Sequence, residues 1–469
     1  MPLSSSFWTD ETDAVFLVRY GASHPSLAAS PQLADSIYNV LPRAAQALGG
    51  YSETVYRLPS TLAMGLALVL IARLTARLIH PEAAWFVTFA CLAQHAFYFQ
   101  AADARPYALG TAIMAAGLWF LVRWLDGARW RDALLFLVFA ALLWPVHPLY
   151  WPFYLVFAGY TIVRLVSKDT NVTWRRAAVV FALLALALVP TFLEALALAG
   201  NARAHVIWAM PRVRGFIDSL NPAMLGGCWA AAWICSRFCR GSAGLAAPAR
   251  SSLALIALWW LCDPLCLFLF SRETGTSVFG RRYYSLALPG AALAGAALAA
   301  YYIPPRMWKP LALVLGLGVV LLRGDWRQPW LAHASMDWRG AAHAINQATL
   351  GADTPVICPS PFIEARVPVW RPSYPLPSVL YAHLVAYPIR GHVVPFPFET
   401  APEAERFAAA LAQSVLPSSG RFFVYGYRTN AHFWENWFER RPELAGWTGH
   451  RLGPFGDVVV VEFDRPKRR

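Results

Sequence analysis

Charged side chains are scarce in this sequence. Only 14% of the residues are Asp, Glu, Lys or Arg, whereas 57% are hydrophobic. A soluble globular protein usually carries about a quarter charged residues, so the shortage indicates a chain that lies mostly in lipid. The net charge of +13 does not indicate a nucleic-acid partner, because the sequence has no basic run with interleaved aromatics of the kind that binds a phosphate backbone.

Patterned cysteines and internal repeats are also lacking. Cys235 and Cys239 lie one helical turn apart, but no His or second Cys pair completes a zinc pattern. The seven cysteines lie mostly in or beside apolar segments, and we interpret them as packing residues without a disulfide framework. The absence of repeated halves is evidence against many transporter folds.

The sequence contains instead a series of long apolar stretches, each close to the roughly 20 residues that a helix needs to cross a bilayer. The loops between them alternate, since 123–131, 164–176 and 237–250 are rich in Arg and Lys while the intervening loops carry fewer. The positive-inside rule places the basic loops in the cytoplasm, and this puts the segments before and after the stretches on the outer face. The ten stretches are 59–79, 83–101, 106–125, 131–147, 149–166, 177–198, 219–236, 251–270, 283–303 and 308–323.

Beyond residue 323 the composition becomes that of a soluble domain. Alternating strand and helix patterns predict a small α/β domain there. We therefore predict a polytopic α-helical membrane protein of about ten transmembrane helices (residues 1–323, with an outer first loop at 1–58) and a soluble extracytoplasmic α/β domain (324–469). The strand segments are "TPVICPS", "HVVPFP", "RFFVYGYR" and "DVVVVEF", and the helical segments are "PEAERFAAALAQSV" and "HFWENWFERR".

Ionisable residues gather in the loops that this topology places outside. Such groups at the edge of an apolar phase are costly unless they pair or line a wet cavity. Carboxylates there can act as general bases or hold a divalent cation, and arginines can bind a phosphate through two hydrogen bonds. Together they suggest chemistry on a lipid-linked phosphate. The candidates are Asp10, Glu11, Asp13, His24, Glu53, Asp103, Arg105, His147, His205, Arg272, Glu273, Arg281 and Arg282.

Each group of candidates also has a purely structural interpretation. The carboxylates of "WTDETDAVF" could be a solvated tail. Asp103 and Arg105 could simply pair with each other, and His147 could be an interfacial packing residue. Arg281 and Arg282 could only anchor the helix that follows them.

Three motifs occur in a fixed order along the chain. They are Asp10-Glu11, then Arg57-Leu58-Pro59-Ser60, then Asp103-Ala104-Arg105-Pro106-Tyr107, and "FGRRYYSLALPGAALAGAALA" and "DWRGAAHAI" follow. In this order they resemble bacterial membrane glycosyltransferases of the C-type superfamily, which include protein O-mannosyltransferase-like enzymes and the aminoarabinose transferase that modifies lipid A. The family has a helix before its Asp-Glu loop, so we expect one upstream of Met1, and Asp103 stands where Glu is commoner.

The resemblance implies an enzyme of the bacterial inner membrane that transfers a hexose or pentose from a polyprenyl-phosphate donor. The acceptor would be a lipid, a glycan or a protein of the cell envelope, as in lipid A or glycan modification, and transfer would be an inverting single displacement at the outer face. Asp10 would be the general base and Glu11 would orient it, while Arg105 with Arg281 or Arg282 would hold the donor phosphate. Asp103, Tyr107, His24 and Arg57 would support these groups, and Glu53 with His205 would hold a possible divalent metal ion.

Other functions remain open from the sequence. A flippase or transporter of lipid-linked sugars would place ionisable groups near the middle of the bilayer, whereas the groups here lie towards one face. A polymerase or ligase acting on lipid-linked glycans would depend on a large outer loop rich in Arg and His. A catalytically inactive assembly protein would use its α/β tail to bind a partner.

Overall fold

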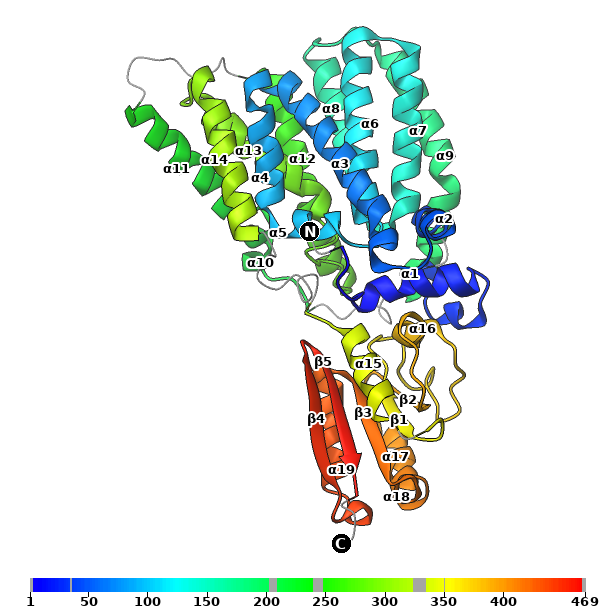
Figure 1. The fold of residues 1–469 in the computed structure, drawn as a ribbon. Coiled ribbons are helices and arrows are strands. Elements are labelled where there is room, and N and C mark those ends of the chain that lie inside the picture. The colour runs from blue at the N-terminus through cyan, green and yellow to red at the C-terminus, as the bar shows by residue number, and fades with distance from the viewer. Residues whose placement is uncertain are drawn as a thin grey trace. The chain divides into compact units, whose positions relative to one another are not determined.

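A computed structural model describes residues 3–33, 36–201, 209–238, 248–323, 335–349 and 351–465. The chain divides into two compact units, whose elements are labelled in Figure 1. The helical unit comprises residues 36–38 and 58–324, and the mixed unit comprises residues 1–35, 39–57 and 325–469. We predicted from the sequence that the segment 1–58 belongs with the spanning helices. Most of it belongs instead to the same unit as the C-terminal sheet.

The helical unit confirms the prediction of a polytopic α-helical membrane protein. Each of the ten apolar stretches contains at least one helix. Among the described residues, five helices are long and apolar enough to cross a membrane, and α4 and α13 are apolar but shorter. These five are α3 (Glu53–Leu78), α6 (Tyr107–Gly127), α8 (Phe153–Val166) with η5 (Pro148–Tyr150), α9 (Trp174–Asn201) and α12 (Arg250–Thr274). The others are η4 (Pro81–Ala83), α4 (Ala84–Ala93), α5 (His95–Ala101), α7 (Trp130–Val146), α10 (Val213–Ser219), α11 (Pro222–Phe238), η7 (Ser285–Ala287), α13 (Leu288–Ala300) and α14 (Pro305–Arg323).

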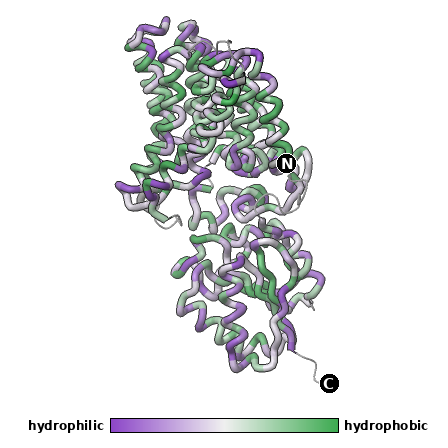
Figure 2. Tube along the Cα trace, turned by 90° about the vertical axis from the view of Figure 1, so that its left-hand side faces the viewer, coloured by the Kyte–Doolittle hydropathy of each residue, from purple (hydrophilic) through white to green (hydrophobic). Residues whose placement is uncertain are grey.

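Small residues allow the helices of this unit to approach closely. A Cβ atom on Gly290 of α13 would lie 2.6 Å from the backbone nitrogen of Trp260 in α12, so only glycine fits at this contact. Large apolar side chains such as Leu186 and Phe192 of α9 are instead exposed on the outside. Figure 2 shows hydrophobic residues along the helices of this unit, as expected for a surface that faces lipid.

The stretch 83–101 is not one continuous helix. It breaks between α4 and α5 at Gln94, whose ψ angle of 119° is extended. The side-chain amide of Gln94 donates to the carbonyl of Leu288 at 3.0 Å and accepts from Asn221 Nδ2 at 2.8 Å. A buried amide needs such partners, so these contacts stabilise the break that hydropathy alone did not predict.

The mixed unit contains one five-stranded sheet in the order β2-β1-β3-β5-β4 (Figure 1). Strand β1 runs parallel to β2 and β3, whereas β5 is antiparallel to β3 and β4. The four predicted strands are present as β1 (Pro355–Pro359), β2 (His392–Phe396), β3 (Arg421–Tyr427) and β5 (Val458–Asp464). The sequence missed the edge strand β4 (Thr448–Phe455), because Gly449, Gly453 and Pro454 disfavour strands and its residues are mostly exposed.

Helices and the N-terminal segment complete the mixed unit. Both predicted helices are present, as α17 and α19, and their apolar faces share a core with Phe396 and Phe422 of the sheet. In the N-terminal part, α1 packs against α16. The elements are α1 (Thr9–Tyr20), η1 (Pro25–Ala29), η2 (Pro31–Leu33), α2 (Val40–Gly49), α15 (Trp338–Ala348), η8 (Val379–Tyr381), α16 (Ala382–Ala386), α17 (Pro402–Ser414), α18 (Leu416–Ser419), α19 (Arg428–Glu439) and η9 (Pro442–Leu444), while η3 (Ile37–Asn39) lies at the boundary between the units.

Candidate functional site

The three carboxylates of the opening motif lie on the first turns of α1. Glu11 is fully buried and Asp13 is only 4% exposed, while Asp10 is half-buried. A solvated tail would leave all three side chains in water, so that alternative is excluded for this segment. The carboxylates instead belong to a folded helix with acidic residues near its N-terminus, where the helix dipole favours negative charge.

Glu11 forms a buried ion pair with Arg57. Nη2 of Arg57 lies 2.5 Å from Glu11 Oε2, and Nε donates to Oε1 at 2.8 Å, so the contact is bidentate. Both side chains are fully buried. Glu11 Oε2 also accepts from the backbone N–H of Trp8 at 3.2 Å, which satisfies one of the unpaired amides at the start of α1.

The remaining donors of Arg57 fix the chain before α1. Its Nη1 donates to the carbonyls of Leu3 and Ser5 at 3.0 and 2.7 Å, and its Nη2 donates to the carbonyl of Ser6 at 3.0 Å. A buried guanidinium requires this degree of satisfaction. Arg57 and Glu11 therefore fix the turn on which Asp10 lies.

His24 supports the same helix from its other end. Its Nδ1 accepts from the backbone N–H of Ser26 at 3.3 Å and so caps η1. Its ring packs edge-on against Phe16 and Tyr20, with centroid distances of 5.1 and 5.5 Å. His24 therefore stabilises the turn after α1.

Glu53, a predicted metal ligand, takes part in an ion pair within the mixed unit. Its Oε1 accepts from Arg339 Nη1 at 3.0 Å and from the Tyr387 hydroxyl at 2.8 Å. A guanidinium beside the carboxylate supplies the positive charge that a divalent ion would bring, so these neighbours do not fit a metal site. No group of three His, Cys, Asp or Glu side chains that could hold a metal occurs among the described residues, and the predicted partner His205 lies outside them.

A second cluster lies in the helical unit around the turn before α6. Asp103 and Tyr107 are almost fully buried and Arg105 is half-buried. The Tyr107 ring lies 5.6 Å from that of His147, and both Arg105 and Arg282 lie within electrostatic reach of this histidine. The turn "DARPY" and Arg282 are thus brought together from positions far apart in the sequence.

His147 and the aromatic residues beside it form the wall of this cluster. The His147 ring lies 5.1 Å from Tyr150 and 5.5 Å from Tyr283. The guanidinium of Arg282 lies over the Tyr283 ring at 5.1 Å from its centroid, a favourable cation–π distance. Arg282 and His147 therefore lie beside the turn that carries Asp103 and Arg105.

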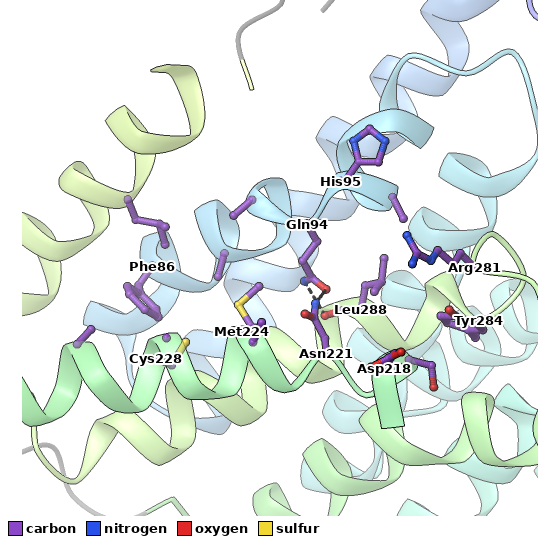
Figure 3. Close-up of a pocket in the computed structure, with 18 of the residues that line it drawn as sticks. Phe86, Gln94, His95, Asp218, Asn221, Met224, Cys228, Arg281, Tyr284 and Leu288 are labelled. Carbon is purple, nitrogen blue, oxygen red and sulfur yellow. Dashed lines mark hydrogen bonds between the residues drawn. The ribbon is translucent and has the colours of Figure 1, made fainter. Parts of the chain in front are cut away.

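Arg281 faces a different place from its neighbour Arg282. It lines a pocket of about 970 Å³ between α4, α5, α10, α11 and α14, whose labelled residues appear in Figure 3. Its polar part contains Arg281, Asp218, Tyr284, His95, Ser219 and the hydrogen-bonded pair Gln94 and Asn221. The rest of the wall is mostly apolar, and it includes Phe86, Met224, Cys228, Leu311, Val314 and Leu315. The pocket thus combines a polar part, which holds one guanidinium and one carboxylate, with a long apolar wall.

Sequence reasoning missed several of these polar residues. Asp263, on α12, is fully buried, and neither of its carboxylate oxygens has a hydrogen-bond partner in the part of the chain that the structure describes. Asp263 could have been identified from the sequence, because it is the one acidic residue in the apolar stretch 251–270 and such residues within membrane spans are usually functional. Gln94 and Asn221 gave weaker signals, since isolated amides are common at helix ends.

Among the comparisons with known proteins, only the search of solved structures finds a match. No family model matches the sequence, and no curated protein matches it. Two crystal structures of ArnT from Cupriavidus metallidurans do match. The apo structure has a TM-score of 0.54 at 16% identity and covers 98% of this chain and 94% of ArnT. The structure bound to undecaprenyl phosphate has a TM-score of 0.54 at 15% identity, with 98% and 95% covered. This chain is therefore similar in fold, over nearly its whole length, to ArnT.

Proposed function

We propose that this protein transfers a sugar from a polyprenyl-phosphate donor to an acceptor at the outer face of the bacterial inner membrane. The observation that carries the proposal is the pocket lined by Arg281, because its apolar wall suits a polyprenyl chain and its polar part suits a phosphate. The fold supports the same conclusion, since a similarly folded protein has been crystallised with undecaprenyl phosphate. The acceptor can be a lipid, a glycan or a protein.

The chemistry is an inverting single displacement. Asp10, the most exposed of the three N-terminal carboxylates, removes the proton of the acceptor while the acceptor oxygen attacks the anomeric carbon. The bond between this carbon and the phosphate oxygen breaks, and the polyprenyl phosphate leaves as an anion. Arg105, with Arg281 or Arg282, stabilises its charge, and Asp103 and Tyr107 support Arg105.

The membrane orientation belongs to the same proposal. Basic loops at 123–131 and 164–176 face the cytoplasm under the positive-inside rule. The N-terminal segment and the C-terminal domain are then extracytoplasmic.

The test measures lipid binding and transfer separately on the purified full-length chain. Undecaprenyl phosphate should bind, and Arg281→Ala should weaken binding about tenfold through loss of a charge-assisted contact. Arg176→Ala, which removes an exposed arginine at the start of α9, should leave binding unchanged. If Arg281→Ala binds undecaprenyl phosphate as tightly as the unsubstituted protein, the pocket is not the donor site.

Transfer is followed by the appearance of sugar covalently attached to an acceptor in membranes that contain the protein. Asp10→Asn should abolish transfer while leaving undecaprenyl phosphate binding and membrane expression intact, and the exposed Asp353→Asn should retain transfer. Retained transfer in Asp10→Asn would refute the base assignment. Translocation of an intact lipid-linked sugar, without attachment to an acceptor, would favour a flippase instead.

A further inference from the structure

The start of α1 is bonded to the C-terminal part of the mixed unit. The hydroxyl of Tyr387 accepts from the backbone N–H of Phe7 at 2.8 Å and donates to Glu53 Oε1 at 2.8 Å. Phe7 directly precedes Trp8, the residue that opens α1, and Glu53 is the first residue of α3. One hydroxyl therefore joins the starts of two helices that are far apart in the sequence.

Arg339 reinforces the same connection. Its Nη1 binds Glu53 at 3.0 Å, its Nη2 donates to the carbonyl of Ser4 at 3.1 Å, and its backbone N–H donates to Ser6 Oγ at 3.2 Å. Arg339 lies in the first turn of α15, which is capped by Asp337 through Gly340 N–H at 2.9 Å. The segment "DWRG" thus contacts Ser4 and Ser6 in the segment that leads into α1.

Burial makes these polar contacts specific. Phe7 is fully buried, and its ring packs against Tyr51, Tyr56 and Tyr387 at centroid distances of 6.4, 5.6 and 6.2 Å. Tyr387 is itself buried, and burial followed by the nearby Glu53 charge raises the pKa of its hydroxyl. The hydroxyl consequently keeps its proton and can donate to Glu53. An unpaired amide at Phe7 would cost a desolvation penalty, so the contact defines one position for the chain.

We infer that Tyr387, Glu53 and Arg339 are positioning residues for the reaction, because they hold the helix that bears Asp10 in place without touching substrate. This inference rests on the proposed function for its consequence on the rate, but the structural connection can be tested independently. It assigns the C-terminal domain a role in catalysis other than binding an acceptor. It also gives Glu53 a role that needs no metal ion.

The first measurement is hydrogen–deuterium exchange on the full-length protein in detergent. Tyr387→Phe removes only the hydroxyl, and exchange of the amides in residues 5–13 should become about five- to tenfold faster, as expected for losing one buried hydrogen bond. The matched control is Tyr381→Phe, whose fully buried hydroxyl donates to the carbonyl of Phe396 at 2.6 Å. That variant loses a comparable bond but should leave exchange in residues 5–13 unchanged.

The second measurement is transfer in the same variants. Tyr387→Phe should reduce the rate of transfer about tenfold while leaving undecaprenyl phosphate binding unchanged, and Glu53→Ala should behave alike. Glu53→Gln, which keeps an oxygen acceptor for Tyr387, should recover part of the rate, and Tyr381→Phe should transfer normally. A general loss of folded protein would instead lower binding and transfer together in all four variants.

The outcomes separate this inference from the proposed function. Unchanged exchange in Tyr387→Phe, or equal acceleration in Tyr381→Phe, overturns the inference whatever the activity. Faster exchange with undiminished transfer also overturns it, because α1 would then be loosened without effect on the reaction. Transfer that survives Asp10→Asn is a failure of the proposed function, and in that case the exchange result still decides whether Tyr387 holds α1.

Discussion

Substitutions of Glu11 and Arg57, which form a buried ion pair, should have non-additive and unequal effects on the free energy of unfolding. Removing one partner of a buried ion pair costs about 3–5 kcal/mol, because it leaves an uncompensated charge. Arg57→Ala leaves the Glu11 carboxylate buried and also deprives three backbone carbonyls of their donor. We therefore expect this substitution to lower the free energy of unfolding of the mixed unit by about 4 kcal/mol.

Glu11→Ala should cost less, about 2 kcal/mol. Arg57 then retains its acceptors at Leu3, Ser5 and Ser6, including Ser5 Oγ at 3.0 Å. The double variant should be about 2 kcal/mol more stable than the sum of the single effects predicts, as is typical for residues in direct contact. The order of the two single variants follows from the backbone carbonyls that bind Arg57 and that remain available to it in Glu11→Ala.

Pulse proteolysis in urea measures these differences in the full-length protein, and mass spectrometry of the fragments identifies cleavage in the mixed unit. The control cycle uses Arg406 and Glu403, whose ion pair at 3.2 Å is largely exposed. It should show a coupling below about 0.5 kcal/mol. Effects of Glu11→Ala and Arg57→Ala that are additive within about 0.5 kcal/mol, or a larger loss in Glu11→Ala, would refute the reasoning.

Two further predictions concern packing and pH. Gly290→Ala should destabilise the helical unit by about 1–3 kcal/mol, because the new Cβ would lie 2.6 Å from the backbone of α12. Gly318→Ala is the control and should not destabilise the unit, because nothing lies within 4 Å of its new Cβ. Thermal unfolding in detergent distinguishes the two variants. Burial lowers the pKa of His383 to about 3, so its contribution to stability is complete above its ordinary pKa of 6.5 and falls by about 1.4 kcal/mol per pH unit below it. His383→Phe should flatten the pH dependence of unfolding of the mixed unit between about pH 6.5 and 5, and an unchanged slope would contradict this.

Periodicity predicted the architecture because local patterns determine it. The apolar stretches had to form helices to satisfy their backbone in lipid, and four strands followed from β-branched and aromatic runs bounded by turns. The sequence did not predict β4, because Gly449, Gly453 and Pro454 are not typical of a strand. This strand forms because β5 supplies its pairing partner. The helix break at Gln94 was not predicted either, because the contacts that stabilise it come from Asn221 and Leu288, which are distant in the sequence.

The candidate site was only partly predictable for the same physical reason. Charge and position identified Arg281 and Arg282 as a pair, but a turn directs neighbouring side chains differently, so Arg281 lines the pocket while Arg282 lies over Tyr283. The partners of Glu53 could not be found, because Arg339 and Tyr387 follow it by about 300 residues and no pattern connects them. Long-range contacts of this kind become visible only in the folded chain.

The three N-terminal carboxylates differ in burial and in their contacts. Glu11 is fully buried and bonded to Arg57 through both of its oxygens, so it cannot accept a proton from a substrate without breaking the pair that orders α1. Asp13 is buried on the same helix. Asp10 alone among these three residues keeps a partly exposed side chain, on a turn fixed by Arg57 from one side and by Tyr387 from the other. An acidic pair that looks equivalent in the sequence therefore has one structural member and one member that can meet an acceptor.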